Sequence, residues 1–216
     1  MKIGILGSGD VGRALGRGFV ELGYEAMIGS GHPDKAELKA WLADNPKNAY
    51  VGSFGEATKF GELVVFAVHW EGGAAENVIR QAGRENFAGK VVIDVTNPLH
   101  FAEGGAPSLI LGHTDSGGEA VQRWLPNAHV VKAWNTVGNA YMYKPNFEEG
   151  VPDMFICGND EQAKNTVIKI LGDFGWSSVD IGGIEGARYL EPMAMLWITY
   201  GMRMGTWKHA FRLLKK

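Results

Sequence analysis

A turn rich in glycine near the amino terminus contains the residues whose spacing points most directly to chemistry. It matches the pattern G-x-G-x-x-G and consists of Gly7, Ser8, Gly9, Asp10, Val11 and Gly12. Glycines at this spacing allow a tight turn, a close approach of the backbone to a pyrophosphate, and close packing of a helix on a strand. The N–H groups at the start of that helix then face the anion. We therefore predict that residues 7–12 bind a dinucleotide.

The turn after the second predicted strand bears on which dinucleotide binds. An Asp or Glu there would hydrogen-bond the ribose 2′-hydroxyl and repel a 2′-phosphate. Residues 29–32 contain no acidic side chain, whereas Ser30, His32 and Lys35 could contact a phosphate. Asp34 lies close by and opposes this interpretation. NADP (NADPH) is therefore the expected cofactor, and NAD is the alternative.

Two later apolar runs, 63–68 and 91–95, lead into residues that could surround a nicotinamide ring. These residues are Val68, His69 and Trp70 after the first run, and Thr96, Asn97 and Pro98 after the second. Open α/β sheets bind ligands at the carboxyl ends of their strands. We expect these residues to line the ribose and the ring, with His69 acting as a wall rather than as a proton carrier.

Alternating strands and helices must position these residues. Strands are expected at 3–6, 25–28, 63–68, 91–95, 129–134, 153–157 and 178–181, and helices at 11–22, 35–43, 74–84, 119–124, 160–174 and 185–214. The runs 63–68 and 91–95 are continuously apolar, which is typical of strands covered on both faces. The alternation predicts an α/β fold with a Rossmann-type, doubly wound parallel sheet. We expect a Rossmann domain over residues 1–134 and a small C-terminal α/β lobe over residues 135–216.

Composition excludes several classes of function. A formal net charge of −3 leaves no general positive field for nucleic acid, so no nucleic-acid partner is expected. The single cysteine, Cys157, lies in an apolar run and cannot form an intrachain disulfide. The 6 histidines include no pair at helical i, i+4 spacing, so no protein-bound metal is expected. These features, with no secretory signal at the start, favour a cytoplasmic protein.

The last predicted helix is rich in methionine and aromatic residues. Its most apolar stretch, 192–202, is shorter than the ~20 residues needed to cross a bilayer, so no membrane association is expected. A stripe of this kind is typical of a protein core or of a dimer face. We therefore expect a homodimer.

Two further runs give the chain a resemblance to known families. Residues 129–136 read HVVKAWNT, and residues 155–160 read FICGND. Together with the glycine turn and residues 91–99, they make the whole chain resemble the deazaflavin (coenzyme F-420)-dependent NADP reductases. The chain is also similar to the cytosolic reductase domain of the STEAP-type ferric reductases. The archaeal deazaflavin enzymes differ in having His at the position of Asn135 and Arg at the position of Gly31.

This resemblance implies hydride exchange between NADPH and a flavin or deazaflavin acting as a small-molecule electron acceptor. The protein would supply stacking geometry and exclude water, while the two rings carry the electrons. By the resemblance, the second ring would lie against Trp134, Asn135, Thr136 and Val137, with Met195 from the last helix. Trp134 and Asn135 would also contact the cofactor, and Asn135, Thr136 and His69 are the candidates for a catalytic role.

Two alternatives remain open at this stage. An NADP-sensing module would bind the cofactor without reducing an acceptor. An NAD(P)-dependent reductase of a small carbonyl or imine would need a general acid, for which Lys132 and His69 are the candidates.

Overall fold

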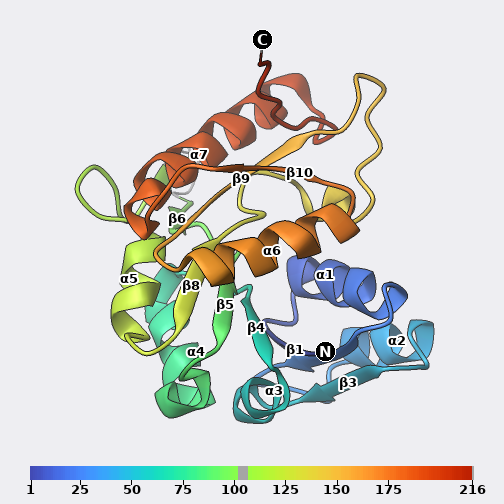
Figure 1. Cartoon of the computed structure of the whole chain (residues 1–216). Coiled ribbons are helices and arrows are strands. Elements are labelled where there is room, and N and C mark those ends of the chain that lie inside the picture. Colours follow the sequence, from blue (N-terminus) through green and yellow to red (C-terminus); the bar gives the residue numbers. More distant parts are fainter. Residues whose placement is uncertain (102–106, 216) are drawn as a thin grey trace.

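Apolar runs of the sequence form the central strands of a sheet that is buried on both faces. The computed structural model, which describes residues 1–101 and 107–215, has an eight-stranded sheet in the order β10-β9-β8-β5-β4-β1-β2-β3 (Figure 1). The strands of this sheet are β1 (Lys2–Leu6), β2 (Glu25–Gly29), β3 (Ala49–Gly52), β4 (Leu63–Phe66), β5 (Val91–Asp94), β8 (His129–Lys132), β9 (Asp153–Gly158) and β10 (Ser177–Asp180). Six neighbouring strands of this sheet, β8, β5, β4, β1, β2 and β3, are parallel to one another. The predicted Rossmann-type α/β fold is confirmed.

Helices cover both faces of this sheet. They are α1 (Asp10–Glu21), α2 (Ala36–Asp44), α3 (Phe54–Phe60), α4 (Ala74–Ala82), α5 (Gly117–Trp124), α6 (Glu161–Asp173) and α7 (Ala187–Met204). Apolar residues of α1, α2 and α6 pack in one core cluster, and those of α3, α4, α5 and the start of α7 pack in the other. Within β4, Val65 faces the first cluster, while Val64 and Phe66 face the second. Because both faces are covered, strand residues are apolar at successive positions.

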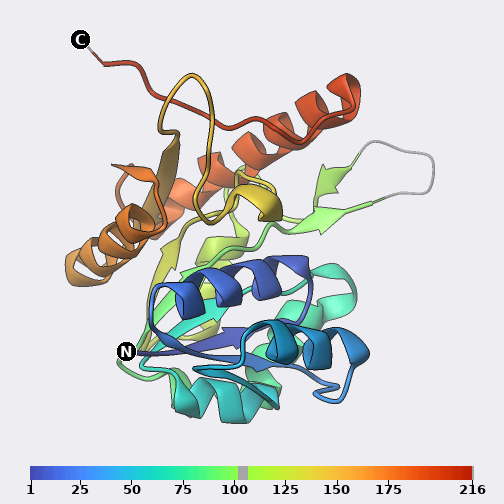
Figure 2. The same cartoon turned by 90° about the vertical axis from the view of Figure 1, so that its right-hand side faces the viewer.

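The C-terminal part of the chain extends the same sheet. Strand β9 pairs with β8 in the antiparallel sense, and β10 pairs with β9 in parallel. The predicted boundary at residues 134 and 135 therefore does not interrupt the sheet, and a separate C-terminal domain stays a prediction. Figure 2 shows α7 across the side of the molecule opposite α2 and α3. Within the described ranges, no helix combines the length and apolarity needed to cross a membrane.

Several element boundaries differ from the prediction. The last helix was predicted to reach residue 214, but α7 ends at Met204, where Gly205 adopts the left-handed conformation (φ 63°) that closes many helices. Strand β3 and helix α3 were not predicted. A short antiparallel pair, β6 (Leu99–His100) with β7 (Ser108–Leu109), was also missed. The chain between β6 and β7 includes residues 102–106, which lie outside the described ranges.

Candidate functional site

The predicted ligand-binding turns meet at one edge of the sheet. Strands β1, β2, β4, β5 and β8 are parallel neighbours, so their carboxyl ends all lie at that edge. The turns that follow them contain the glycine motif, the residues after 29, the residues after 66, the residues after 94, and residues 133–136. This is the position at which open α/β sheets bind ligands.

The glycine turn has the geometry of a pyrophosphate cradle. Gly7 has a φ of +125°, and a Cβ added there would lie 2.0 Å from the carbonyl oxygen of Ala67. At Gly12 an added Cβ would lie 2.0 Å from the carbonyl oxygen of Gly7, so the start of α1 packs directly on the turn. A Cβ added at Gly9, in contrast, would meet no atom of the described residues within 4 Å, and Gly9 is exposed at the N-cap of α1. The backbone at Gly9 is thus open to an anion facing the first N–H groups of α1.

The turn after β2 lies against the glycine turn. Ser30 is buried, its Oγ lies 3.1 Å from the Oγ of Ser8, and it accepts a hydrogen bond from the backbone N–H of His32 (3.1 Å). The side chains of His32 and Lys35 are exposed, as is that of Asp34. Two hydroxyls therefore meet where a 2′-substituent of the adenosine ribose would bind in this fold.

The residues after β4 and β5 form a wall with different degrees of exposure. Val68 is half-buried and His69 is exposed, whereas Trp70 is only 8% exposed. The indole of Trp70 stacks on Trp124 of α5 (ring centroids 5.4 Å apart) and its Nε1–H donates to Thr96 Oγ1 (2.7 Å). The Trp70 indole is therefore a buried support of this edge. Pro98 is also buried.

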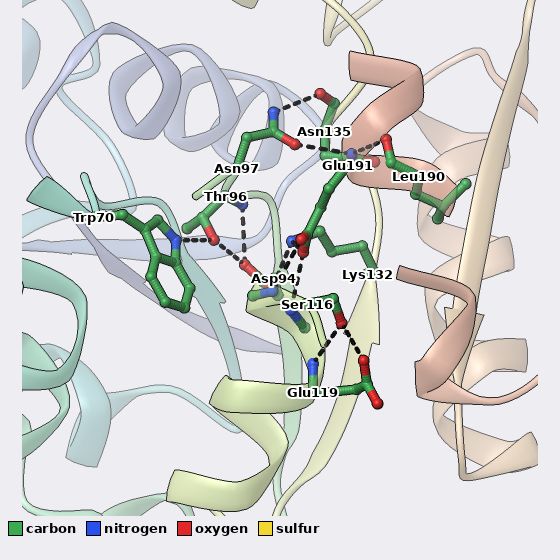
Figure 3. Close-up of polar contacts among 12 residues, drawn as sticks. Trp70, Asp94, Thr96, Asn97, Ser116, Glu119, Lys132, Asn135, Leu190 and Glu191 are labelled. Carbon is green, nitrogen blue, oxygen red and sulfur yellow. Dashed lines mark hydrogen bonds and ion pairs between the residues drawn. The ribbon is translucent and has the colours of Figure 1, made fainter. Parts of the chain in front are cut away.

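Two asparagines join the turn after β5 to the turn after β8 (Figure 3). The Nδ2 of Asn97 donates to the backbone carbonyl of Asn135 (2.8 Å), and the Nδ2 of Asn135 donates to Asn97 Oδ1 (3.0 Å) and to the carbonyl of Leu190 in α7 (2.8 Å). Asn135 is 5% exposed, and among the described atoms its buried Oδ1 has no hydrogen-bond partner. This oxygen is an acceptor that needs a donor.

Beneath the asparagines lies a buried cluster of three charged side chains (Figure 3). The Nζ of Lys132, at the end of β8, lies 2.9 Å from Asp94 Oδ2 and 2.8 Å from Glu191 Oε1. All three side chains are 0–1% exposed. Burial disfavours a charged lysine, but the two carboxylates outweigh this effect and raise the pKa of Lys132 above its ordinary value. Lys132 therefore remains protonated at neutral pH.

Backbone groups complete the bonding of both carboxylates. Glu191 accepts from the N–H of Gly117 (2.9 Å) and of Gly118 (3.0 Å), the first residues of α5. Asp94 Oδ1 accepts from the N–H (2.9 Å) and the Oγ1 (2.7 Å) of Thr96. Glu191 thus fixes α7 to α5, and Asp94 fixes the turn that leads to Asn97. Buried charges are tolerated when they are paired and bonded in this way.

A second ion pair holds the start of α7 to α5. The guanidinium of Arg188 donates to both carboxylate oxygens of Glu119, with one bond of 2.8 Å from Nε. These hydrogen bonds are the main reason why the pKa of Glu119 lies below its ordinary range. Arg188 and Glu191 therefore hold two successive turns of α7 against α5.

Several residues predicted for the acceptor ring lie in the core. Trp134 is 0% exposed, packs on Phe174 (ring centroids 5.1 Å apart), and donates from Nε1 to the carbonyl of Met142 (3.2 Å). Thr136 is buried with its Oγ1 directed to Met154 Sδ (3.8 Å). Their side chains therefore lie in the core rather than in the predicted ring pocket. Of the other residues, Val137 is 7% exposed, and Met195 is half-buried on α7.

One of the two candidate general acids is excluded, and the lone thiol is unreactive. Lys132 was a candidate general acid for a carbonyl or imine, but it is fully buried and holds its proton between two carboxylates. Burial raises the pKa of the Cys157 thiol to about 12, so this cysteine is a poor nucleophile at neutral pH. His69, which is exposed, is the candidate acid that remains.

The sequence reasoning missed Glu191. This carboxylate lies 59 positions from Lys132 along the chain, and spacing alone could not pair them. A signal was nevertheless present, because Asp94 and Lys132 end two apolar strands that must be buried. A charged side chain at such a position requires an opposite charge from another element.

Comparison with known proteins places these features in a family context. Residues 2–98 match the family model described as "NADP oxidoreductase coenzyme F420-dependent". The F420-dependent NADP reductase of Methanocaldococcus jannaschii is 32% identical over 209 residues, which cover 92% of this chain and 91% of that protein. A solved structure from Arthrobacter sp. FB24, classed as an F420-dependent NADP-reductase, has a TM-score of 0.93 at 35% identity and matches all of both chains.

A metalloreductase also occurs among the relatives. The metalloreductase STEAP3 of Rattus norvegicus is 30% identical over 194 residues, which cover 90% of this chain. The match spans only 36% of the length of STEAP3.

Proposed function

Since the chain belongs to the coenzyme F420-dependent NADP reductase family, we propose that it is an oxidoreductase that transfers hydride between NADPH and a flavin or deazaflavin acceptor. The observation that carries this proposal is the glycine turn at the carboxyl edge of the sheet. There Gly9 leaves the N-terminus of α1 open to a pyrophosphate, beside a turn whose residues 29–32 contain no acid.

The residues at this edge fit NADP at three points. The backbone at Gly9 would receive the pyrophosphate, because an added Cβ there meets no atom within 4 Å in the described part of the chain. Ser30, His32 and Lys35 would receive the 2′-phosphate. The Oδ1 of Asn135, which has no hydrogen-bond partner among the described residues, would accept an N–H from the carboxamide of the nicotinamide.

The bound nicotinamide supplies the hydride chemistry, and the chain positions it. Asn97 and Asn135 hold each other in place through their mutual hydrogen bonds and would orient the ring end of the cofactor. The buried Trp70, Thr96 and Pro98 would keep water from that side of the ring. Because the hydride passes between two rings, the rate depends on their distance and alignment more than on a proton donor.

Steady-state oxidation of NADPH tests this proposal. The purified chain is supplied in turn with coenzyme F420, FMN, riboflavin and a ferric chelate, and the loss of NADPH absorbance is followed. We expect turnover with a ring acceptor, and we expect Asn135→Ala to lower kcat. Asn139→Ala, at an exposed position outside the site, is the matched control and should leave kcat unchanged.

Other outcomes would support the alternatives. Tight NADPH binding without turnover of any acceptor would contradict hydride transfer and favour an NADP-sensing module. Turnover confined to small carbonyls or imines would favour a reductase of that class, with His69 as the first residue to replace.

We also propose that the chain forms a homodimer through α7. Tyr189, Leu196 and Tyr200 lie on one face of this helix, at spacings of seven and four, and are 73%, 62% and 48% exposed. An exposed apolar face of this kind commonly marks an interface. Size-exclusion chromatography with light scattering should give the mass of two chains, and a clean monomer would contradict the proposal.

A further inference from the structure

Arg13 occupies the flank of α1 that faces β2 and α2. Its backbone carbonyl accepts a hydrogen bond from Nε1 of Trp41 in α2 (3.1 Å). Trp41 is 5% exposed, and a Cβ added at Gly16, one turn further along α1, would lie 2.9 Å from its ring. These contacts fix the side of α1 from which the Arg13 side chain extends, and that side adjoins the turn after β2.

A chain of contacts links the Arg13 guanidinium to that turn. Its NH1 donates to the backbone carbonyl of Ser8 (2.8 Å). The Oγ of Ser8 lies 3.1 Å from the Oγ of Ser30, which in turn accepts from the N–H of His32 (3.1 Å). The Arg13 side chain is only 27% exposed. A partly buried cation is thus bonded to the backbone of Ser8, the residue whose hydroxyl contacts that of Ser30.

The remaining donors of Arg13 are available to an anion. NH2 pairs with Asp10 (2.6 Å), but the Asp10 side chain is 74% exposed, and exposed pairs of this kind contribute little. A guanidinium has five N–H donors, and Ser8 and Asp10 use two of them. Its planar geometry matches phosphate oxygens. The acids that oppose an anion here are Asp10 and Asp34, both exposed to water.

We infer that Arg13 is a specificity-determining residue that binds the 2′-phosphate of the dinucleotide together with the hydroxyls of Ser8 and Ser30. This inference rests on the proposed NADP dependence and deepens it. His32 and Lys35 are exposed side chains that must be ordered when the ligand binds, whereas the Arg13 guanidinium is already held in place. Arg13 therefore provides the preformed positive charge of the site.

Two adenosine nucleotides isolate the contribution of the 2′-phosphate. The full chain is titrated with adenosine 2′,5′-bisphosphate and with adenosine 5′-monophosphate, without acceptor, and tryptophan fluorescence is followed. The native chain should bind the bisphosphate more tightly. Arg13→Gln should weaken bisphosphate binding by about tenfold or more and leave monophosphate binding unchanged. Arg17→Gln is the matched control, because Arg17 lies on the same helix, is 69% exposed, and pairs with Glu21 (2.7 Å); it should change neither affinity.

The outcomes separate this inference from the proposed function. If the native chain binds both nucleotides equally, the proposed preference for NADP fails, and the role of Arg13 fails with it. If the native chain prefers the bisphosphate and Arg13→Gln keeps that preference, the role of Arg13 is overturned while the proposed function stands. Arg13→Lys retains the charge without the planar fork and should give an intermediate preference. It also provides a second test should Arg13→Gln fail to fold.

Discussion

Replacing Lys132 by Met is expected to destabilise the protein strongly. The change leaves the carboxylates of Asp94 and Glu191, each 0–1% exposed, without the cation that lies between them. Breaking a buried ion pair by removing one partner costs about 3–5 kcal/mol of unfolding free energy. For a chain of this length, each kcal/mol shifts the melting temperature by about 2–4 °C. The expected decrease is therefore about 6–20 °C.

The stabilisation by Lys132 should not vary with pH in the neutral range. The folded-state pKa of Lys132 is raised, so the stability it contributes is present below the ordinary lysine pKa and disappears only as the pH rises through the raised value. Lys132 should thus stabilise the fold equally throughout the neutral range.

Thermal unfolding followed by circular dichroism at several pH values in the neutral range measures the loss of stability. Lys144→Met is the matched control, because Lys144 is 70% exposed and lies 3.7 Å from Glu21. It should change the unfolding free energy by less than about 0.5 kcal/mol. A decrease in melting temperature of about 2 °C or less for Lys132→Met would refute the reasoning.

Three further predictions concern single sites. Gly9→Ala should leave the melting temperature unchanged, since its Cβ meets no atom of residues 1–101 and 107–215 within 4 Å, but should weaken NADPH binding in a fluorescence titration. Gly12→Ala should lower the melting temperature instead, since its Cβ would lie 2.0 Å from the carbonyl oxygen of Gly7. Trp134→Ala should cost about 3–5 kcal/mol in denaturant unfolding, because the indole is fully buried, and a loss of acceptor binding without a loss of stability would contradict this. Cys157, whose pKa is raised to about 12, should resist iodoacetamide at mildly alkaline pH in the folded chain and react after unfolding, as quantified by mass spectrometry.

The Rossmann part of the fold was predictable because its signals are local. The glycine turn follows a strand and opens a helix within a few residues, and β4 and β5 are continuously apolar. Strand β3 has only four residues, Ala49–Gly52, and Tyr50 within it is 40% exposed, so it gave no such run. The end of α7 was misplaced because apolar residues continue beyond Gly205, where the chain turns back.

The site was only partly predictable because its key contacts are not local. Asn97 was placed by its strand and Asn135 by the family resemblance; both follow parallel strands and are hydrogen-bonded to each other, while their roles toward a ligand stay a prediction. The orientation of Trp134 could not be predicted, because its positive φ of 55° departs from the alternation of a strand. The dependence of Lys132 on Glu191 appears only when α7 has been placed against the sheet.

The buried cluster also fits the order in which the ribosome makes the chain. Asp94 and Lys132 end neighbouring strands, so their neutral pair can form as soon as β8 joins β5. Glu191 follows 59 residues later and adds its charge together with hydrogen bonds from the N–H groups of Gly117 and Gly118. Folding in synthesis order therefore does not require an unpaired charge to be buried at any intermediate length. The last charge arrives on α7 and meets hydrogen-bond donors that α5 already presents, so the docking of α7 completes the cluster in one step.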